Sequence, residues 1–371
     1  MFEGQKKKKF NAPLQGSYSP EDCLFLLKPI RVDYLSIENK ERLIQSKELH
    51  YSEVIHKETA PSEQYSNLFV QIAEQYKARL ARETMSLAKK ICKKRSGNIT
   101  ILSLARAGTP IGVLLQRALT KILKRDSTHY SVSIIRDRGI DDVALDYVLQ
   151  HGHEPESFVF VDGWTAKGTI SNELRKSIKK YNESRKVKIA DELFVISDIG
   201  GIADVQATFD DYAIPNALMN STVSGLVSRS ILNDQIGEED FHGCVEYHHL
   251  SGYDRSNWFV DIVTAEMSVS NLPPHCTESK LLRRQASKNF LDFVMKEFGI
   301  TDVNRVKPGI AEATRVLLRR VTDQLLVKRL DDPNINHLKC LAFEKNVLVT
   351  EVSDMPFGAC ALIKDVPELK A

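Results

Sequence analysis

The stretch Phe158-Val-Phe-Val-Asp-Gly-Trp-Thr-Ala-Lys-Gly-Thr-Ile170 decides the fold class of this chain. Four β-favouring residues lead into Asp162, and a turn of small and hydroxyl residues then opens a helix. A parallel strand that ends in this way points backbone N–H groups and a helix N-terminus at one place, and that geometry binds phosphate. We expect the carboxylate of Asp162 beside the phosphate, where a ribose hydroxyl or a magnesium ion would lie.

Strands and helices alternate on both sides of this stretch. The apolar pattern predicts strands over 98–104, 130–135, 158–161 and 192–197, and helices over 109–124 and 168–181. Strands rich in Val, Ile and Leu that alternate with helices predict a parallel, doubly wound α/β sheet. Ligands of such sheets bind beyond the carboxyl ends of the strands. The loops after 104, 135, 161 and 197 are therefore the ones that matter for function.

At 371 residues the chain is too long for a single core, and we expect several regions. Residues 1–95 are predicted to form a basic tail, with Lys6–Lys9, and N-terminal helices, one opened by Ser19-Pro-Glu-Asp22 and a long amphipathic one over 62–95. Residues 96–270 form the main domain. Residues 271–299 form the linker helix region, in which Pro273-Pro274 breaks the chain and a helix follows over roughly 278–298. Residues 300–371 form a small second α/β unit, with helices over 309–320 and 335–346 and strands over 324–329 and 347–352.

The composition excludes several classes of protein. A net charge of +2 gives no overall attraction to nucleic acid or membrane. The six cysteines are scattered without a CxxC pair, which predicts reduced thiols rather than disulfides or a zinc site. No apolar run approaches the ~20 residues of a membrane span, and the N-terminus lacks the apolar core of a signal peptide. We expect a cytoplasmic protein with no membrane contact.

A second loop suited to anions follows the first strand, at Ala105-Arg-Ala-Gly-Thr-Pro110. Gly108 permits close backbone approach, Thr109 offers a hydroxyl group, and Arg106 offers a forked cation. Taken alone, such a turn more often only connects a strand to a helix and binds no ligand. Placed at the same sheet edge as the 162–169 loop, it predicts a substrate with phosphates at both ends.

At this point the pattern resembles the type I phosphoribosyltransferases. The resemblance implies that Asp162 contacts the ribose hydroxyls, and magnesium only indirectly through those hydroxyls or water. It assigns the pyrophosphate to Arg106, Ala107, Gly108 and Thr109, and the 5-phosphate to Thr165, Ala166, Lys167, Gly168 and Thr169. The usual loop carries two consecutive acids, whereas Gly163-Trp164 follow the single Asp162 here. Trp164 then either stacks on a base and closes the pocket or is a buried core residue.

More specifically, the chain resembles the phosphoribosyltransferase-like family of tellurium-resistance stress clusters, also called cysteine protease StiP. The resemblance spans nearly the whole chain, through Gly16-Ser-Tyr-Ser-Pro-Glu-Asp22, His50-Tyr-Ser-Glu53, Ser103–Pro110, Ile135-Arg-Asp-Arg-Gly-Ile-Asp141, Val161–Thr169 and Asn220–Arg229. It implies a role in making a nucleoside-like metabolite during a stress response.

Two further loops complete the expected site. Arg136, Asp137 and Arg138 follow the second strand, where type I enzymes carry a mobile loop, and Arg136 would neutralise departing pyrophosphate. A surface salt-bridge cluster is the alternative for these residues. Asp198 ends the next strand, where an acceptor base or amine would be recognised. We therefore expect Asp162, Arg106 and Arg136 to be catalytic and Asp198 to bind substrate.

The C-terminal unit carries Gly309-Ile-Ala-Glu-Ala-Thr-Arg315, which resembles the signature of the Pelota-like RNA-binding domains, with Ala311 in place of the usual Asn. The resemblance implies that Gly309, Glu312, Thr314 and Arg315 contact structured RNA. A dimerisation or docking module is the alternative.

The prediction from the sequence is a magnesium-dependent phosphoribosyltransferase that transfers the ribose phosphate of phosphoribosyl pyrophosphate to or from a base or nucleoside-like acceptor. Two alternatives stay open. One is a sensor without catalysis that binds a ribose phosphate or RNA. The other is a cysteine protease, for which Cys244 near His242, His248 and His249 is the best local candidate and Cys23 another. The sequence names neither the acceptor nor the RNA, and an oligomer is possible.

Overall fold

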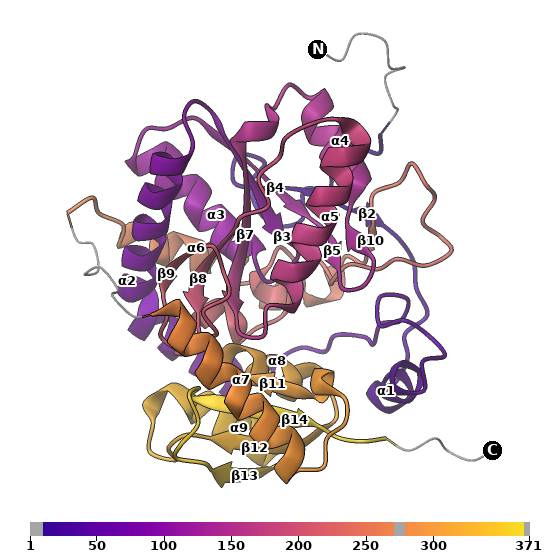
Figure 1. Cartoon of the computed structure of the whole chain (residues 1–371), viewed down its shortest axis with the longest axis vertical. Helices are drawn as coiled ribbons and strands as arrows, with labels where there is room; N and C mark the ends of the chain where they lie inside the picture. The colour runs from indigo at the N-terminus through magenta and orange to yellow at the C-terminus, as the bar shows by residue number, and fades with distance from the viewer. Residues whose placement is uncertain (1–9, 271–278, 367–371) are drawn as a thin grey trace.

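The computed structural model describes residues 10–270 and 279–366. The basic tail predicted at Lys6–Lys9 and the chain break predicted at Pro273-Pro274 lie outside these residues. Figure 1 shows a larger unit built on a six-stranded sheet, with a smaller C-terminal unit beneath it.

Six parallel strands form the main sheet, in the order β1–β4–β3–β7–β8–β9. Their bounds are β1 (Leu24–Leu26), β3 (Ile99–Leu104), β4 (Ser127–Val132), β7 (Phe158–Thr165), β8 (Leu193–Asp198) and β9 (Val205–Thr208). Every residue of β3 is buried, as expected of a strand covered on both faces. The predicted parallel α/β sheet is confirmed.

Helices cover both faces of this sheet. One face packs against α2 (Glu63–Lys94), α3 (Thr109–Arg117) and α6 (Ser256–Ala265), and the other against α4 (Asp142–Gln150) and α5 (Thr169–Arg185). The long helix predicted over 62–95 is confirmed as α2. The Ser62 side chain caps it by accepting from the N–H of Tyr65, and its apolar stripe is buried. No helix in the described part of the chain is long and apolar enough to cross a membrane.

Two of the predicted helices differ from the structure. The helix expected to open at Ser19-Pro-Glu-Asp22 is wrong, because Leu24–Leu26 pairs with β4 as an edge strand. The Asp22 carboxylate does not cap a helix; it accepts from Arg117 Nε at 2.9 Å and Nη2 at 2.6 Å. The helix expected over 109–124 is α-helical to Arg117 and continues as a π-helical turn over Ala118–Ile122.

Short elements complete the main unit. They are α1 (Ile37–Gln45), β2 (Lys28–Pro29) paired with β10 (Gly243–Cys244), and β5 (Ile134–Ile135) paired with β6 (Gly139–Ile140). The sequence analysis did not predict α4 or these pairs.

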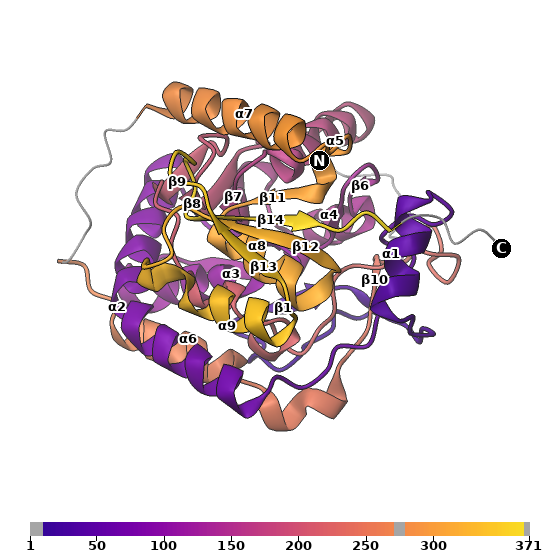
Figure 2. The same ribbon diagram turned by 90° about the horizontal axis from the view of Figure 1, so that it is seen from below.

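The C-terminal unit is a four-stranded sheet in the order β11–β14–β12–β13. It comprises β11 (Val306–Pro308), β12 (Thr322–Val327), β13 (Leu348–Glu351) and β14 (Ala359–Ile363), with α8 (Ile310–Arg319), α9 (Asn336–Glu344) and α7 (Lys280–Glu297). Helices α8 and α9 pack on one face of the sheet and α7 on the other. Figure 2 shows this sheet lying across the end of the main unit. The helices and strands predicted here are confirmed, while β11 and β14 were not predicted.

The two units share one core. Buried side chains of α8 and α9 belong to the same apolar cluster as those of α2, α3 and α6. The carboxylate of Asp211, in the main unit, accepts from the N–H groups of Ile310 at 2.9 Å and Gly358 at 2.8 Å. The C-terminal unit is therefore held against the carboxyl ends of the parallel strands.

Candidate functional site

The loop after β3 is packed tightly against the sheet. A Cβ atom on Gly108 would lie 2.5 Å from the carbonyl oxygen of Val161, so this position requires glycine. The Thr109 hydroxyl lies 2.7 Å from Ser131 Oγ and is fully buried. Arg106 donates through Nη1 to Glu58 Oε2 at 2.9 Å and to the carbonyl oxygen of Val227 at 3.0 Å. Arg106 Nη1 and the Thr109 hydroxyl group are thus engaged within the protein.

Most of the predicted 162–169 loop either belongs to strand β7 or contacts the C-terminal unit. Strand β7 continues to Thr165, which is buried together with Ala166. Lys167 Nζ donates to the carbonyl oxygens of Val303 and Val306, both at 2.8 Å. Gly168 has a φ of +76° and precedes α5, which Thr169 begins. The lysine expected to wrap a phosphate therefore ties the main unit to the C-terminal unit.

Asp162 lies half-buried at this junction. Its Oδ1 accepts from the N–H of Gly163 at 2.7 Å. Burial raises the pKa of Asp162 to about 7, and this shift outweighs the opposite effect of Arg315. A carboxyl that is partly protonated at neutral pH is a poor magnesium ligand. Magnesium stays a prediction from the sequence.

The raised pKa of Asp162 predicts a pH-dependent stability. From pH 3.8 to about 7 the folded protein holds a proton that the unfolded chain releases, so this group's stabilisation is lost as the pH rises through 7. Asn would keep the oxygen acceptor and stay neutral. The free energy of unfolding of Asp162→Asn, relative to that of the wild type, should therefore grow by roughly 2 to 3 kcal/mol between pH 5 and pH 8.

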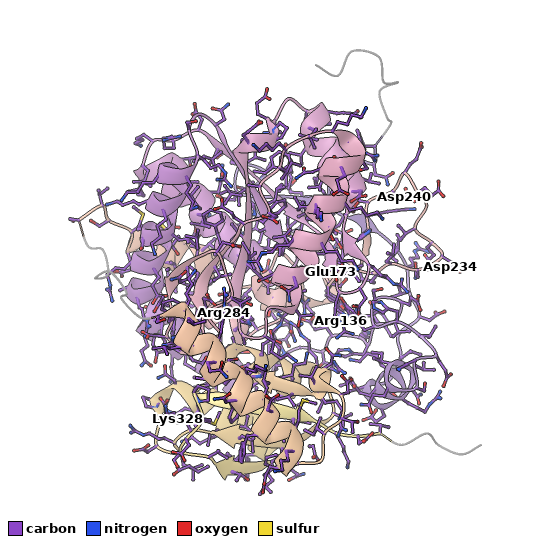
Figure 3. The ribbon with its side chains drawn as sticks, in the orientation of Figure 1. Arg136, Glu173, Asp234, Asp240, Arg284 and Lys328 are labelled. Atoms are coloured by element: carbon purple, nitrogen blue, oxygen red, sulfur yellow. The ribbon has the colours of Figure 1, made fainter. Side chains whose placement is uncertain are left out.

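Urea unfolding at the two pH values measures this change. Asp234→Asn is the matched control, because Asp234 is exposed on a loop far from the junction (Figure 3). An advantage of Asp162→Asn that is the same at pH 5 and pH 8 would contradict the raised pKa.

Two other predicted site residues make internal contacts. Asp198 is fully buried, and its carboxylate accepts from the N–H groups of Ile202 at 2.8 Å and Ala203 at 3.0 Å. Arg136 lies at the boundary of the two units (Figure 3) and donates to Asn304 Oδ1 at 3.0 Å. Asp198 thus shapes the turn after β8, and Arg136 is a second docking contact.

The residues predicted to bind RNA lie on or beside α8. Thr314 is buried within the C-terminal unit, 2.8 Å from His337 Nε2. Glu312 Oε1 accepts from Trp164 Nε1 at 3.0 Å, and the Arg315 guanidinium lies over the Trp164 ring at 5.5 Å from its centroid. A Cβ on Gly309 would lie 2.4 Å from Ile199 Cδ1. Trp164 is 7% exposed and packs between the two units.

The histidines nearest to Cys244 are engaged elsewhere. His242 Nδ1 lies 2.7 Å from Ser133 Oγ, His248 Nε2 is 3.8 Å from Glu246, and His249 Nε2 lies 2.9 Å from the carbonyl oxygen of Glu58. Cys244 itself is fully buried, and burial raises the pKa of its thiol far above the ordinary value. The predicted pairing of Cys244 with a neighbouring histidine is not formed in this structure.

The other described thiols fall into two groups. Cys23 and Cys360 are fully buried, and burial raises the pKa of each. Cys92 and Cys340 are partly exposed, and each lines an open cavity, of about 590 Å³ and 570 Å³ respectively. The cavity at Cys92 is also lined by five cations, Lys93, Lys94, Arg95, Lys124 and Arg125.

Two residues that organise the junction, Glu58 and Asp211, were missed from the sequence. Glu58 pairs with Arg106 and accepts two hydrogen bonds from Ser221, both at 2.7 Å. Asp211 caps α8. Neither stands in a motif, and each finds its partners far along the chain, so no local signal could have revealed them.

A family match over most of the chain and one similar protein name the same family. Residues 16–264 match the family described as tellurite-like stress resistance cysteine protease StiP, and residues 285–365 match the PELOTA RNA binding domain. A protein of Acinetobacter baylyi named cysteine protease StiP is 39% identical over 364 residues, which is 94% of this chain and 94% of that protein. A hypoxanthine phosphoribosyltransferase of Trypanosoma cruzi, solved with IMP, covers 49% of this chain and 86% of its own at 11% identity, with a TM-score of 0.28.

These matches overturn the main prediction from the sequence. A phosphoribosyltransferase was expected, but the family and the A. baylyi relative are both described as a cysteine protease. The likeness to the T. cruzi enzyme is too low to support transfer of a ribose phosphate. The predicted transferase activity is wrong, and the alternative of a cysteine protease is the one that the family supports.

Proposed function

This chain belongs to the family described as tellurite-like stress resistance cysteine protease StiP, and from that premise we propose that it hydrolyses peptide bonds with a cysteine thiolate as nucleophile. The observation that carries the proposal is the 39% identity, over 94% of both chains, to a protein named as a cysteine protease. A cysteine thiolate attacks the carbonyl carbon of the scissile peptide, and a general acid protonates the departing amine. Water then hydrolyses the thioester that is left on the enzyme, which releases the carboxylic acid and restores the thiol.

Accessibility and charge favour one thiol among those that the structure describes. A reactive cysteine needs partial exposure and a positive environment that stabilises its thiolate. Cys92 has both. Burial raises the pKa of its thiol, while Arg125 acts in the opposite direction. At Cys340 burial and Glu344 both raise the pKa, and Cys340 Sγ lies 3.8 Å from Glu344 Oε1. We assign the nucleophile to Cys92.

A scan of single Cys→Ala variants at all six cysteines tests the function. With an unfolded protein as substrate, Cys92→Ala should lower kcat/KM by at least about 1,000-fold, because removing a nucleophile abolishes the covalent route. Cys340→Ala is the matched control, since Cys340 also lines an open cavity, and it should keep its activity. Circular dichroism of each variant checks its fold.

The scan tests the protease activity and the assignment of Cys92 as nucleophile separately. If activity is lost on replacing another cysteine while Cys92→Ala stays fully active, that cysteine is the nucleophile and the protein is still a cysteine protease. Full activity in all six variants, or wild-type protein that cleaves nothing, would rule out a cysteine protease.

RNA binding by the C-terminal unit is a second proposal, favoured by the match of residues 285–365 to the PELOTA RNA binding domain. The side of α8 that carries Glu312 and Arg315 contacts Trp164. If RNA uses the same residues, RNA and the main unit would compete for that side of α8.

A further inference from the structure

Five cations gather where the two units meet, and we call them the interdomain cation cluster: Lys40, Arg106, Arg229, Arg319 and Arg320. Contacts from both units hold it together. Lys40 Nζ, in α1, donates to the carbonyl oxygen of Arg319 at 2.8 Å. Arg319 Nε donates to the side-chain oxygen of Asn220, and the charges of Arg106 and Arg320 both act on Arg229.

Two carboxylates pair with these cations, Glu41 and Glu58, and the charges of Glu312 and Arg315 act on Arg319 with opposite sign. Glu41 Oε2 accepts from Arg320 Nη2 at 2.7 Å, and Glu58 pairs with Arg106. Lys40 Nζ lies 4.0 Å from Glu41. Arg229 donates to the carbonyl oxygens of Val54 and Ser230, which are uncharged. Within the described residues neither Arg229 nor Arg319 forms an ion pair, so the cluster holds more positive than negative charge.

Two of the side chains that carry this surplus positive charge are buried away from solvent. Lys40 and Arg106 are each 4% exposed. Burial, and then the neighbouring arginines, lower the pKa of Lys40 to about 7 and that of Arg229 to about 10. Arg106 Nε is buried without a hydrogen-bond partner. Like charges brought together away from water cost free energy that a bound anion would offset.

We propose that the interdomain cation cluster binds a multiply charged oxyanion of the phosphate class. Guanidinium groups match such oxyanions because two parallel N–H donors reach two oxygens. A small anion suits the site better than a nucleic acid does, since Lys40 and Arg106 are too buried for a polynucleotide backbone to reach. Because the cations come from both units, the bound anion ties the C-terminal unit to the main unit. The proposal does not depend on proteolysis.

Calorimetric titration and thermal unfolding in chloride buffer test the site, with inorganic pyrophosphate, inorganic phosphate and tellurite at matched ionic strength. Pyrophosphate should bind with one-to-one stoichiometry and raise the unfolding temperature. Arg229→Gln and Arg319→Gln should each weaken binding by about tenfold or more. Without the anion both variants should be at least as stable as the wild type, because each removes a repelled charge. Arg329→Gln, at an exposed position of the C-terminal unit, is the control and should keep its affinity.

A comparison of the three anions shows which oxyanion the interdomain cation cluster binds. A response to tellurite alone, with none to phosphate or pyrophosphate, would overturn the assignment to the phosphate class. The proposal is overturned if none of the three anions binds, or if all of the variants bind as the wild type does. It is also overturned if a structured RNA stabilises the protein through Arg229 and Arg319 while the small anions do not.

Discussion

Replacing Gly200 by alanine should lower the free energy of unfolding by about 3–5 kcal/mol. Gly200 follows β8, where a Cβ atom would lie 1.8 Å from the carbonyl oxygen of Ala166. That oxygen belongs to the backbone, so no side chain can rotate to make room. One of two loops at the carboxyl edge of the sheet has to move, and Ala166 packs against the α7 side of the C-terminal unit.

Urea unfolding followed by circular dichroism measures the effect. Gly252→Ala is the matched control, because no atom lies within 4 Å of its added Cβ, and it should change stability by less than about 0.5 kcal/mol. Equal stability of the two variants would mean that the loops after β7 and β8 lie farther apart than this structure has them.

Replacing Asp211 by alanine should lower the free energy of unfolding by about 2–4 kcal/mol. The Asp211 carboxylate accepts from Ile310 N–H at the start of α8 and from Gly358 N–H before β14. Alanine leaves both donors without that partner at a largely buried junction. Asp211→Asn keeps one acceptor oxygen and should show an intermediate loss.

Asp210→Ala is the control for this change, because the neighbouring carboxylate is 63% exposed and pairs with Arg79. Its loss should cost less than about 1 kcal/mol. The same unfolding midpoint for Asp211→Ala and Asp210→Ala would contradict the role of Asp211 in holding the C-terminal unit.

The regular elements could be predicted because their signals are local. The apolar spacing of α2 and the apolar run of β3 follow from burial at helical and strand periods. The helix expected at Ser19 failed for the opposite reason. Its capping pattern is local, but pairing of Leu24–Leu26 with β4, and of Asp22 with Arg117, depends on residues about 100 positions away.

The candidate site could be predicted only in part. Positions after β3, β7 and β8 do meet at one edge, as the parallel sheet requires. What covers that edge could not be predicted, because the contacts of Lys167 and Trp164 are with residues more than 130 positions away. The predicted reaction was wrong because loops that resemble a phosphate cradle fix neither the ligand nor the chemistry.

The contact between Trp164 and α8 links two features of the chain that look separate in sequence. Trp164 donates an N–H group to Glu312 and lies beneath Arg315. An acid at position 164 could not donate, and it would set a negative charge beside Glu312. A chain of this architecture therefore docks the C-terminal unit in this way only with a residue at position 164 that both donates a hydrogen bond and offers an aromatic face to Arg315.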